Sequence, residues 1–257
     1  MEELIRESWR IYRSLEDRPF VVMPSMPILF FGDSSRYFSS RLKVLTVGLN
    51  PSRIEFPNKP RFLRFGTAHM VYPRILEGVC YEEYLQALNG YFLQPPNHPY
   101  KSWFNSFERL LTGLDCSYYG TATNSALHTD LCSPLATDPT WNKLPREAQI
   151  ELLQFGVPLW HSLVDHLSPD VIVASVARSH LDRISFSSQN DWTIIHTVDR
   201  NNPYNVEVRN LKITNGKTVH LIFGRAANKP FGTVSNIDKR KIGLAIKDHF
   251  YPGQTVE

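Results

Sequence analysis

The sequence is poor in cysteine and has no long apolar run. Its three cysteines, Cys80, Cys116 and Cys132, are odd in number and widely spaced along 257 residues. This pattern argues against a disulfide framework, a Cys-x-x-Cys zinc site and a four-cysteine iron–sulfur cluster. No stretch approaches the roughly 18 consecutive apolar residues of a membrane-spanning helix. The acidic start, Met1–Leu4, lacks the basic and apolar blocks of a signal peptide, so we expect a cytoplasmic protein without a membrane partner.

Internal repeats, low-complexity tracts and Gly/Ser-rich linkers are also absent. Hydrophobic residues make up 42% and charged residues 21%, which excludes wholesale disorder and a collagen-like chain. A chain of this length can bury one substantial core. We therefore expect a single domain over residues 1–257, with an N-terminal helical extension over 1–26 and an aromatic-rich insert over 53–102.

Positive charge is concentrated in two parts of a chain whose net charge is only +3. Ten basic residues and two acidic ones lie between Arg200 and Lys247. Five basic residues and one acidic residue, Glu55, lie between Arg53 and Arg74. Two basic stretches in a nearly neutral chain fit a phosphate-bearing partner. A solvated charged face explains the same pattern about equally well.

The hydrophobic pattern predicts alternating helices and strands. Helices are expected over residues 2–16, 81–91, 103–111, 145–167 with a break near Pro158, from about 177, and 235–250. Strands are expected over residues 28–31, 41–47, 118–123, 170–176, 192–198, 206–214 and 218–223. Asn215-Gly216 between the last two strands is a strong hairpin signal. This alternation predicts a three-layer α/β/α fold with a central, mostly parallel sheet.

Asparagine follows three of the expected strands. Asn50 follows the strand 41–47, Asn124 the strand 118–123 and Asn228 the strand 218–223. The carboxyl ends of parallel strands meet at one edge of a sheet, where binding sites form. An amide offers a donor and an acceptor and does not titrate, which suits recognition of a nucleobase edge better than general acid–base catalysis. Turn formation is the competing explanation for each single loop.

These segments resemble the motifs of the uracil-DNA glycosylase superfamily. Residues 43–52, Lys-Val-Leu-Thr-Val-Gly-Leu-Asn-Pro-Ser, look like the first motif of its mismatch-specific and thymine-DNA glycosylase branch, Gly-Ile-Asn-Pro-Gly. Residues 28–33, 124–138, 170–177 and 227–233 are similar, in the same order, to later or flanking segments of the family. The resemblance spans about residues 28–250, and the order and spacing of the motifs carry it.

The sequence departs from the family at three points. Asn50 stands where the efficient uracil enzymes have an acidic residue, as in the mismatch-specific branch. Val176-Ala177-Arg178 replaces a Gly-Lys turn, and the last motif, Asn228-Lys229-Pro230, has a lysine before its proline. The segment between Pro51 and Trp103 is longer and richer in aromatic residues than in compact relatives, which leaves the identity of the substrate open.

The resemblance implies a monomeric, monofunctional DNA glycosylase with a uracil-DNA glycosylase-like fold. Such an enzyme flips a nucleotide out of double-stranded DNA and hydrolyses its N-glycosidic bond, which leaves an abasic site. It needs no cofactor and no metal. Uracil or a mismatched pyrimidine is the substrate that the family implies for base excision. The long aromatic insert equally suggests a bulky modified pyrimidine, such as a hypermodified phage cytosine, and hence an antiviral defence enzyme.

The resemblance also implies the roles of the site residues. Asn50 would hold the attacking water through its side-chain carbonyl, and Asn228 would lie near the departing base or its phosphate. Asn124 would recognise the Watson–Crick edge of the base. The backbone N–H groups around Gly48 and Leu49 would also hydrogen-bond the base. An aromatic ring would stack on it, for which the candidates are Phe62, Phe56 and Phe65.

The last loop and helix would bind the DNA around the flipped nucleotide. Arg225, Lys229 and Lys239 are the candidate phosphate contacts. Ser52 and Thr233 are candidate neutral donors to phosphate. Phe231 or Lys229 would fill the space that the flipped base leaves, since wedge residues of this kind unstack base steps.

Two other functions stay open. A catalytically silent module of the same fold would bind a modified base or single-stranded nucleic acid. A metal-dependent nuclease is more remote, because Asp170 and the Glu207-Val208-Arg209 segment match a Pro-Asp…Glu-x-Lys arrangement only in part. Magnesium sites need clustered carboxylates. His128-Thr129-Asp130 could be taken for a metal-binding pair, but no second cluster in the sequence supports it.

Overall fold

The structure is a computed structural model that describes residues 1–66, 68, 81–93 and 99–250. Part of the expected aromatic-rich insert, with Arg74 and Cys80, lies outside these ranges. The chain divides into two compact units. The first unit comprises Met1–Ser35, Gly48–Tyr100 and Leu127–Leu167, and the second comprises Arg36–Val47, Lys101–Ala126 and Ser168–Glu257. No helix within the described ranges is long and apolar enough to cross a membrane.

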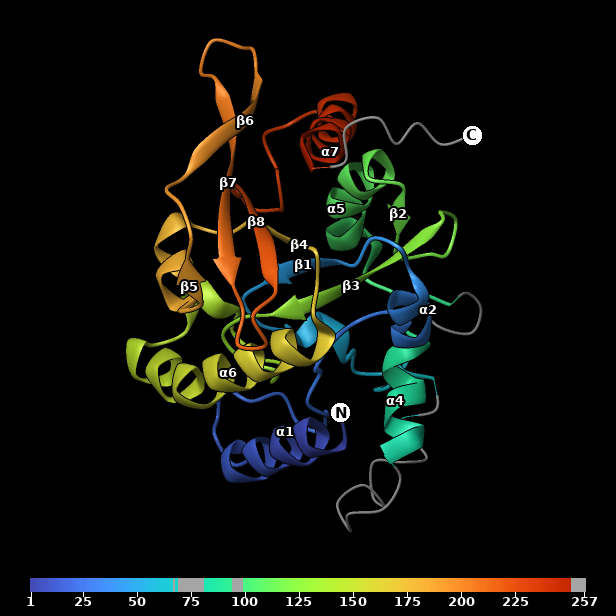
Figure 1. The fold of residues 1–257 in the computed structure, drawn as a ribbon. Coiled ribbons are helices and arrows are strands. Elements are labelled where there is room, and N and C mark those ends of the chain that lie inside the picture. The colour runs from blue at the N-terminus through green and yellow to red at the C-terminus, as the bar shows by residue number, and fades with distance from the viewer. Residues whose placement is uncertain (67, 69–80, 94–98, 251–257) are drawn as a thin grey trace. The chain divides into compact units, whose positions relative to one another are not determined.

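The protein belongs to the α/β class and has a mixed sheet of eight strands (Figure 1). The strands are β1 (Val44–Gly48), β2 (Cys116–Ser117), β3 (Asn124–Asp130), β4 (Val171–Ala174), β5 (Ser187–Ser188), β6 (Thr193–Val198), β7 (Tyr204–Lys212) and β8 (Thr218–Gly224). Their order is β2-β3-β1-β4-β8-β7-β5, with β6 beside β7. The pairs β2–β3, β1–β4 and β4–β8 are parallel, whereas β7 is antiparallel to its neighbours. The expected α/β class is thus confirmed.

The three central strands β1, β4 and β8 bring their carboxyl ends to one edge. Val47 pairs with Ala174, and Ala174 pairs with Phe223. All residues of β1 and β4 are buried, as expected for apolar, β-branched runs in the middle of a sheet. The loops that follow β1, β4 and β8 therefore begin at the same edge of the sheet, as predicted for the loops that carry Asn50 and Asn228.

Two helices of the second unit pack closely on each other. These are α5 (Lys101–Gly113) and α7 (Asn236–Phe250). A methyl group on Gly113 would collide with the carbonyl of Arg240, so the two backbones can approach only at glycine. The predicted cap of α7 is confirmed, because Ser235 Oγ accepts from the N–H of Asp238 at 3.1 Å and donates to its carboxylate at 2.7 Å. A short helix, α2 (Ser34–Ser39), precedes β1.

The first unit is held together by helices and aromatic side chains. Helix α1 (Glu2–Leu15) packs on α6 (Arg146–Leu167), which continues through Pro158 without the expected break. Helix α4 (Tyr81–Asn89) confirms the helix predicted there. Two single-turn 3-10 helices, η1 (Arg53–Glu55) and η2 (Trp141–Lys143), lie in the connecting segments.

The segment between α5 and α6 differs from the prediction. The expected strand over 118–123 is wrong, because β2 ends at Ser117 and β3 begins at Asn124. Every residue of β3 is buried. The strand therefore has no alternation of buried and exposed residues, which is the pattern that identifies a half-exposed strand in a sequence.

The expected strand over 28–31 forms only one bridge, from Phe31 to His128. The helix expected after Ala177 is the 3-10 helix η3 (Arg178–Arg183).

Candidate active site

Asn50 lies two residues beyond the carboxyl end of β1, and the protein holds its amide nitrogen in place. Nδ2 donates hydrogen bonds of 2.8 Å to Thr137 Oγ1 and to the carbonyl of Pro51. The carbonyl of Leu135 lies 3.4 Å from the same nitrogen. No residue that the structure describes donates to Asn50 Oδ1, and the side chain is half-buried. The fixed nitrogen therefore leaves the carbonyl oxygen as the group that Asn50 can offer to a water molecule.

Thr137 is the residue that positions Asn50, and sequence reasoning missed it. Its side chain is fully buried, and Oγ1 donates to the carbonyl of Pro139 at 2.9 Å. Its N–H donates to the carbonyl of Pro51, and its carbonyl accepts from the N–H of Arg53, both at 3.2 Å. A threonine in an irregular segment carries no sequence signal for such a role, because the role depends on which loop lies beside it.

His128 and Asp130 meet β1 at Gly48. Both side chains are buried, and their i, i+2 spacing on β3 places them on one face of that strand. A methyl group on Gly48 would collide with Asp130 Oδ1 and would lie 3.0 Å from His128 Nε2. Backbone bonds from Leu131 N–H to Gly48 O, 3.1 Å, and from Cys132 N–H to the next carbonyl, 2.8 Å, hold the two segments together. The glycine is therefore needed for the two polar groups to reach the end of β1.

Asp130 is nearly buried and has few polar neighbours. The residue is 9% exposed, and His128 Nε2 lies 3.7 Å from Asp130 Oδ1. No hydrogen bond to its carboxylate comes from the described part of the chain. A buried charged group without hydrogen bonds costs free energy, and such groups in proteins have partners in most cases. The Asp130 oxygens are not among the fully enclosed side-chain atoms without a partner in the described part of the chain, which are Trp9 Nε1, Ser25 Oγ and Arg209 Nε.

Glu55 is a second buried acid in the first unit. Burial raises its pKa to about 7, whereas Tyr91 and then Arg64 act to lower it and the charge of Asp130 raises it. Tyr91 Oη donates to Glu55 Oε2 at 2.5 Å, and Arg64 Nε lies 3.8 Å from the same oxygen. Near neutral pH the Glu55 side chain is therefore about half protonated.

Aromatic rings lie beside the partners of the two buried acids, Asp130 and Glu55. The ring of Phe31 lies 5.6 Å from that of His128 and 4.8 Å from that of Tyr91. Of the three rings expected to stack on a base, Phe56 and Phe65 are fully buried and stack on each other at 5.4 Å. Phe62 is half-buried and contacts Phe56 edge-on at 5.8 Å. Phe62 thus stays the accessible candidate of the three.

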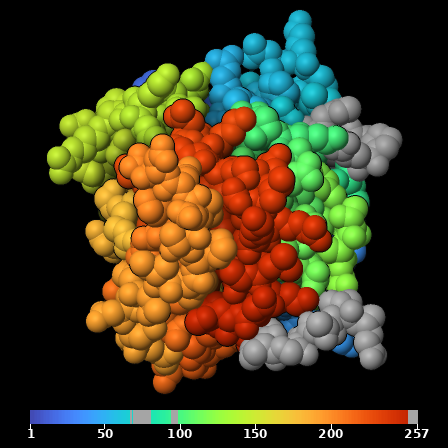
Figure 2. All heavy atoms as spheres, turned by 90° about the horizontal axis from the view of Figure 1, so that it is seen from above, coloured from blue at the N-terminus to red at the C-terminus, as the bar shows by residue number. Residues whose placement is uncertain are grey.

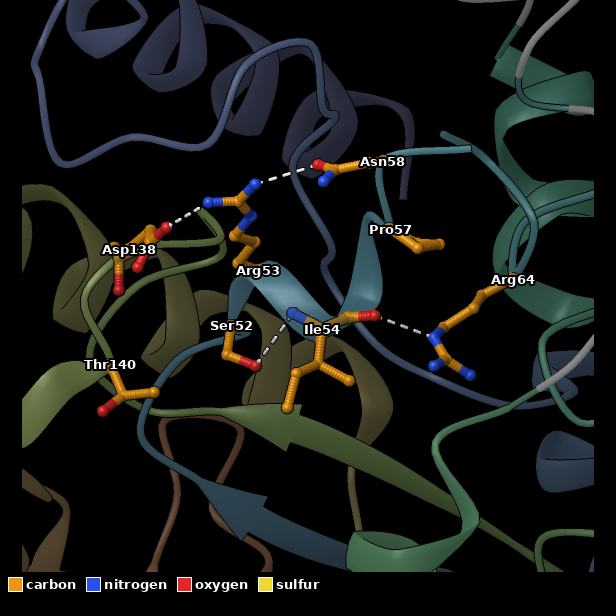
Figure 3. A pocket seen from close by; sticks show the side chains of 9 residues that line it. Ser52, Arg53, Ile54, Pro57, Asn58, Arg64, Asp138 and Thr140 are labelled. Atoms are coloured by element: carbon orange, nitrogen blue, oxygen red, sulfur yellow. Dashed lines mark hydrogen bonds and ion pairs between the residues drawn. The ribbon is translucent and has the colours of Figure 1, made fainter. Parts of the chain in front are cut away.

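An open pocket of about 500 Å³ lies against the segment that follows Asn50 (Figure 3). Arg53 spans one side of it, bound to Asp138 at 2.7 Å and to Asn58 at 2.9 Å. Ser52 lines the pocket, and its Oγ accepts from the N–H of Ile54 at 3.3 Å. Ser52 is half-buried and lies beside Arg53 in the lining of the pocket. This setting suits the phosphate contact that is expected of it.

In the second unit, the loop after β8 presents polar residues to solvent. Arg225, Asn228 and Lys229 are exposed, and Figure 2 shows their segment and α7 (red) beside the β6–β7 ribbon (orange). The loop forms a tight turn, in which Ala227 and Lys229 exchange two backbone hydrogen bonds. Asn228 at its tip has a φ of 57°, a conformation that asparagine tolerates better than most residues. Arg225 and Lys229 are thus accessible for the phosphate contacts expected of them.

Two residues expected to bind DNA are buried instead. Phe231 has no exposed surface, its ring packs over Gly224, and its N–H donates to Ser175 Oγ at 2.8 Å. A wedge role does not fit this position, which leaves Lys229 as the candidate. Lys239 is 5% exposed, and burial lowers its pKa. Its side chain packs inside the unit rather than toward a phosphate.

The two remaining expected site residues, Thr233 and Asn124, are both bound by other groups of the protein. Thr233 is exposed, but its Oγ1 accepts from Arg200 at 3.2 Å and its carbonyl accepts from the same guanidinium at 2.6 Å. Asn124 begins β3 and is bound within the protein. Its Oδ1 accepts from the N–H of Leu42 at 3.1 Å, and its Nδ2 donates to the carbonyl of Asp115 at 3.3 Å. Both edges of the amide are in use, so the expected role in base recognition does not fit.

The carboxylates of the nuclease alternative are engaged in ion pairs. Asp170 binds Lys217 at 2.7 Å and accepts from the N–H of Lys43 at 2.8 Å. Glu207 pairs with Arg178, which also lies over the ring of Phe223. Nowhere in the described ranges do three histidine, cysteine or acidic side chains form a group that could hold a metal ion.

Comparison with known proteins does not assign the chain to a family. No family model matches the sequence, and no curated protein matches it significantly.

Proposed function

We propose that the protein is a monofunctional DNA glycosylase. It hydrolyses the N-glycosidic bond of a flipped-out pyrimidine nucleotide and leaves an abasic site. The observation that carries this proposal is the fixed amide of Asn50, whose nitrogen is bound to Thr137 and whose oxygen has no donor among the described residues. An oriented acceptor at the carboxyl end of a central strand is what the positioning of a nucleophilic water requires.

The chemistry follows from the charges that form as the bond breaks. The base leaves with the electron pair of the bond, and the sugar becomes cation-like. Water, oriented by Asn50 Oδ1, adds its hydroxyl to C1′, and its proton goes to the base or to solvent. The buried carboxylate of Asp130 beside Gly48 adds negative charge to this edge of the first unit, which stabilises a cation-like transition state.

The second unit supplies groups that suit contact with DNA. Arg225 and Lys229 are exposed on a tight turn, and Arg200 lies nearby through its bonds to Thr233. Cations on an exposed turn bind phosphates without regard to sequence and release counterions as they do so. Such contacts hold the duplex while one nucleotide leaves the stack.

Release of a free base tests the proposal. The protein is incubated, with a chelator present, with duplexes that carry uracil or a mismatched thymine and with phage genomic DNA that carries modified cytosine. Mass spectrometry detects the released base, and alkaline cleavage detects the abasic sites. We expect the wild type to release the base, and likewise the control variant Asn142→Ala, which changes an exposed residue. Asn50→Ala should release the base at least about 100-fold more slowly.

The same experiment separates the alternatives. Binding of DNA without release of any base would favour the catalytically silent module. Strand cleavage that needs magnesium and passes through no abasic site would favour the nuclease. Equal release by Asn50→Ala and the wild type would remove Asn50 from the mechanism.

A further inference from the structure

The pocket beside η1 has the hydrogen-bond donors of an anion site. Its described lining residues include the arginines Arg53 and Arg64 and the hydroxyl residues Ser52 and Thr140. None of the described lining residues carries an aromatic ring on which a flipped base could stack. Guanidinium and hydroxyl groups are common partners of phosphate oxygens in protein–DNA interfaces. The lining therefore suits a phosphate group better than a base.

The guanidinium of Arg53 is paired at the protein surface, where ion pairing is weak. Its Nη1 donates to Asp138 Oδ2 at 2.7 Å, and its Nη2 donates to Asn58 Oδ1 at 2.9 Å (Figure 3). Both side chains of the ion pair are about half exposed, 53% for Arg53 and 51% for Asp138. Ion pairs that are open to water contribute little to stability. A phosphate can therefore replace Asp138 as the partner of Arg53 at small cost.

Arg64 places a second positive charge at the pocket. Its side chain is 16% exposed, and its Nε donates to the carbonyl of Ile54 at 2.9 Å (Figure 3). Glu55 Oε2 lies 3.8 Å from the same nitrogen, and burial raises the pKa of Glu55 to about 7. Near neutral pH about half of the Glu55 side chains are uncharged, so Glu55 cancels only part of the charge of Arg64. The pocket thus keeps positive charge for an anion.

The pocket lies next to the group that would hold the attacking water. Thr137 lines the pocket, and its Oγ1 accepts from Asn50 Nδ2 at 2.8 Å. Ser52 follows Asn50 by two residues and forms a parallel bridge with Thr137. In a nucleotide, C1′ and the flanking phosphates are joined through a single sugar ring. A nucleotide with C1′ at Asn50 therefore brings a flanking phosphate close to this pocket.

We infer that the pocket binds a phosphate that flanks the target nucleotide, and that this phosphate replaces Asp138 as the partner of Arg53. The inference rests on the proposed function for the choice of DNA as the ligand. Arg53 and Arg64 together neutralise the phosphate, and the hydroxyls of Ser52 and Thr140 donate to its oxygens. The carboxylate of Asp138, already half exposed, is then hydrated by solvent.

Neutral phosphates placed one at a time test the inference. Duplexes carry a tetrahydrofuran abasic-site analogue, which requires no choice of base, and a methylphosphonate in place of one of the phosphates near it. Equilibrium affinity is measured at fixed salt for the wild type and for Arg53→Ala. At one position we expect methylphosphonate to weaken binding by the wild type about 10-fold, and binding by Arg53→Ala less than about 2-fold. The control Arg10→Ala, at an exposed arginine that is paired with Glu7, should keep the wild-type pattern.

Asp138→Asn removes the acid that competes for Arg53. It should bind the unmodified duplex about 3-fold more tightly than the wild type does, and this gain should disappear when the contacted phosphate is replaced by methylphosphonate. Asp17→Asn, the same change at another exposed acid of the first unit, should bind like the wild type. Equal losses at every methylphosphonate position for the wild type and Arg53→Ala would overturn the phosphate site. Unchanged or weaker binding by a folded Asp138→Asn would overturn the displacement of Asp138.

The outcome for the proposed function is separate, because release of a free base is measured on its own. Release of a base without any phosphate contact that depends on Arg53 would leave the glycosylase proposal standing and overturn the phosphate site. A phosphate contact that depends on Arg53, in a protein that releases no base, would support the site and overturn the glycosylase proposal. If neither is found, both fall.

Discussion

Glu55 should make the stability of the protein depend on pH in a direction opposite to that of most acids. Its pKa in the folded protein is about 7, compared with 4.5 for an exposed glutamate, and burial is the main cause. Between these two values the folded protein keeps a proton that the unfolded chain has lost. Folding is therefore unimpeded by Glu55 below about pH 4.5 and becomes progressively less favourable as the pH rises toward 7.

The size of the effect follows from the same values. One pKa unit corresponds to about 1.4 kcal/mol, so ionisation of the buried Glu55 costs about 3 kcal/mol of unfolding free energy at pH 8 and above. That is a large part of the net stability of a domain. The variant Glu55→Gln cannot ionise and keeps an oxygen for the hydrogen bond from Tyr91. It should lack this cost at every pH.

Urea unfolding of the wild type and of Glu55→Gln at several pH values from 4.5 to 8.5 measures the difference. The unfolding free energy of Glu55→Gln relative to that of the wild type should rise by about 3 kcal/mol across this range. Glu147→Gln, a change at an exposed glutamate, should show no such rise. Parallel curves for the wild type and Glu55→Gln would refute the reasoning. Tyr91→Phe should move the ionisation of Glu55 to still higher pH, because Tyr91 acts to lower the pKa of Glu55.

Four further changes test the site and the DNA-binding loop. Thr137→Val removes the acceptor that fixes Asn50, and we expect about 10-fold slower base release in single-turnover assays with little change in DNA affinity. Lys229→Ala should weaken binding to all DNAs alike and lower the slope of log affinity against log salt by about one. Lys239→Ala, at a buried lysine, should instead lower the melting temperature and leave that slope unchanged. Asn124→Asp should cost about 1 kcal/mol of stability, measured by urea unfolding, without changing the order of preferred bases.

The central strands could be predicted from the sequence because their residues depend on local pattern alone. The apolar runs of β1 and β4, and the Asn-Gly turn between β7 and β8, each mark one element regardless of what packs beside it. Strand β3 could not be predicted in this way. It is buried along its whole length yet carries His128, Thr129 and Asp130, so its polar residues resemble those of a loop.

The site residues differ in the same way, because some can be predicted from the local sequence and others depend on distant contacts. Asn50 could be found because it follows a recognisable strand, and its expected position is what the structure shows at that edge. The burial of Phe231 and Lys239 depends on contacts with Ser175 and Ser106, which lie more than fifty residues away in sequence. The sequence marks Asp130 only as half of a possible metal-binding pair, because its contact with Gly48 on another strand leaves no trace in the local pattern.

The contact between Gly48 and Asp130 has a consequence for the way this sequence can change over time. Any side chain at position 48 would displace the carboxylate at position 130, so the two positions cannot vary independently. A lineage that gives up the glycine must also give up the aspartate or shift β3. Among descendants of a common ancestor, we therefore expect a substitution at position 48 to accompany loss of the acid at position 130, and glycine to persist wherever the acid is kept.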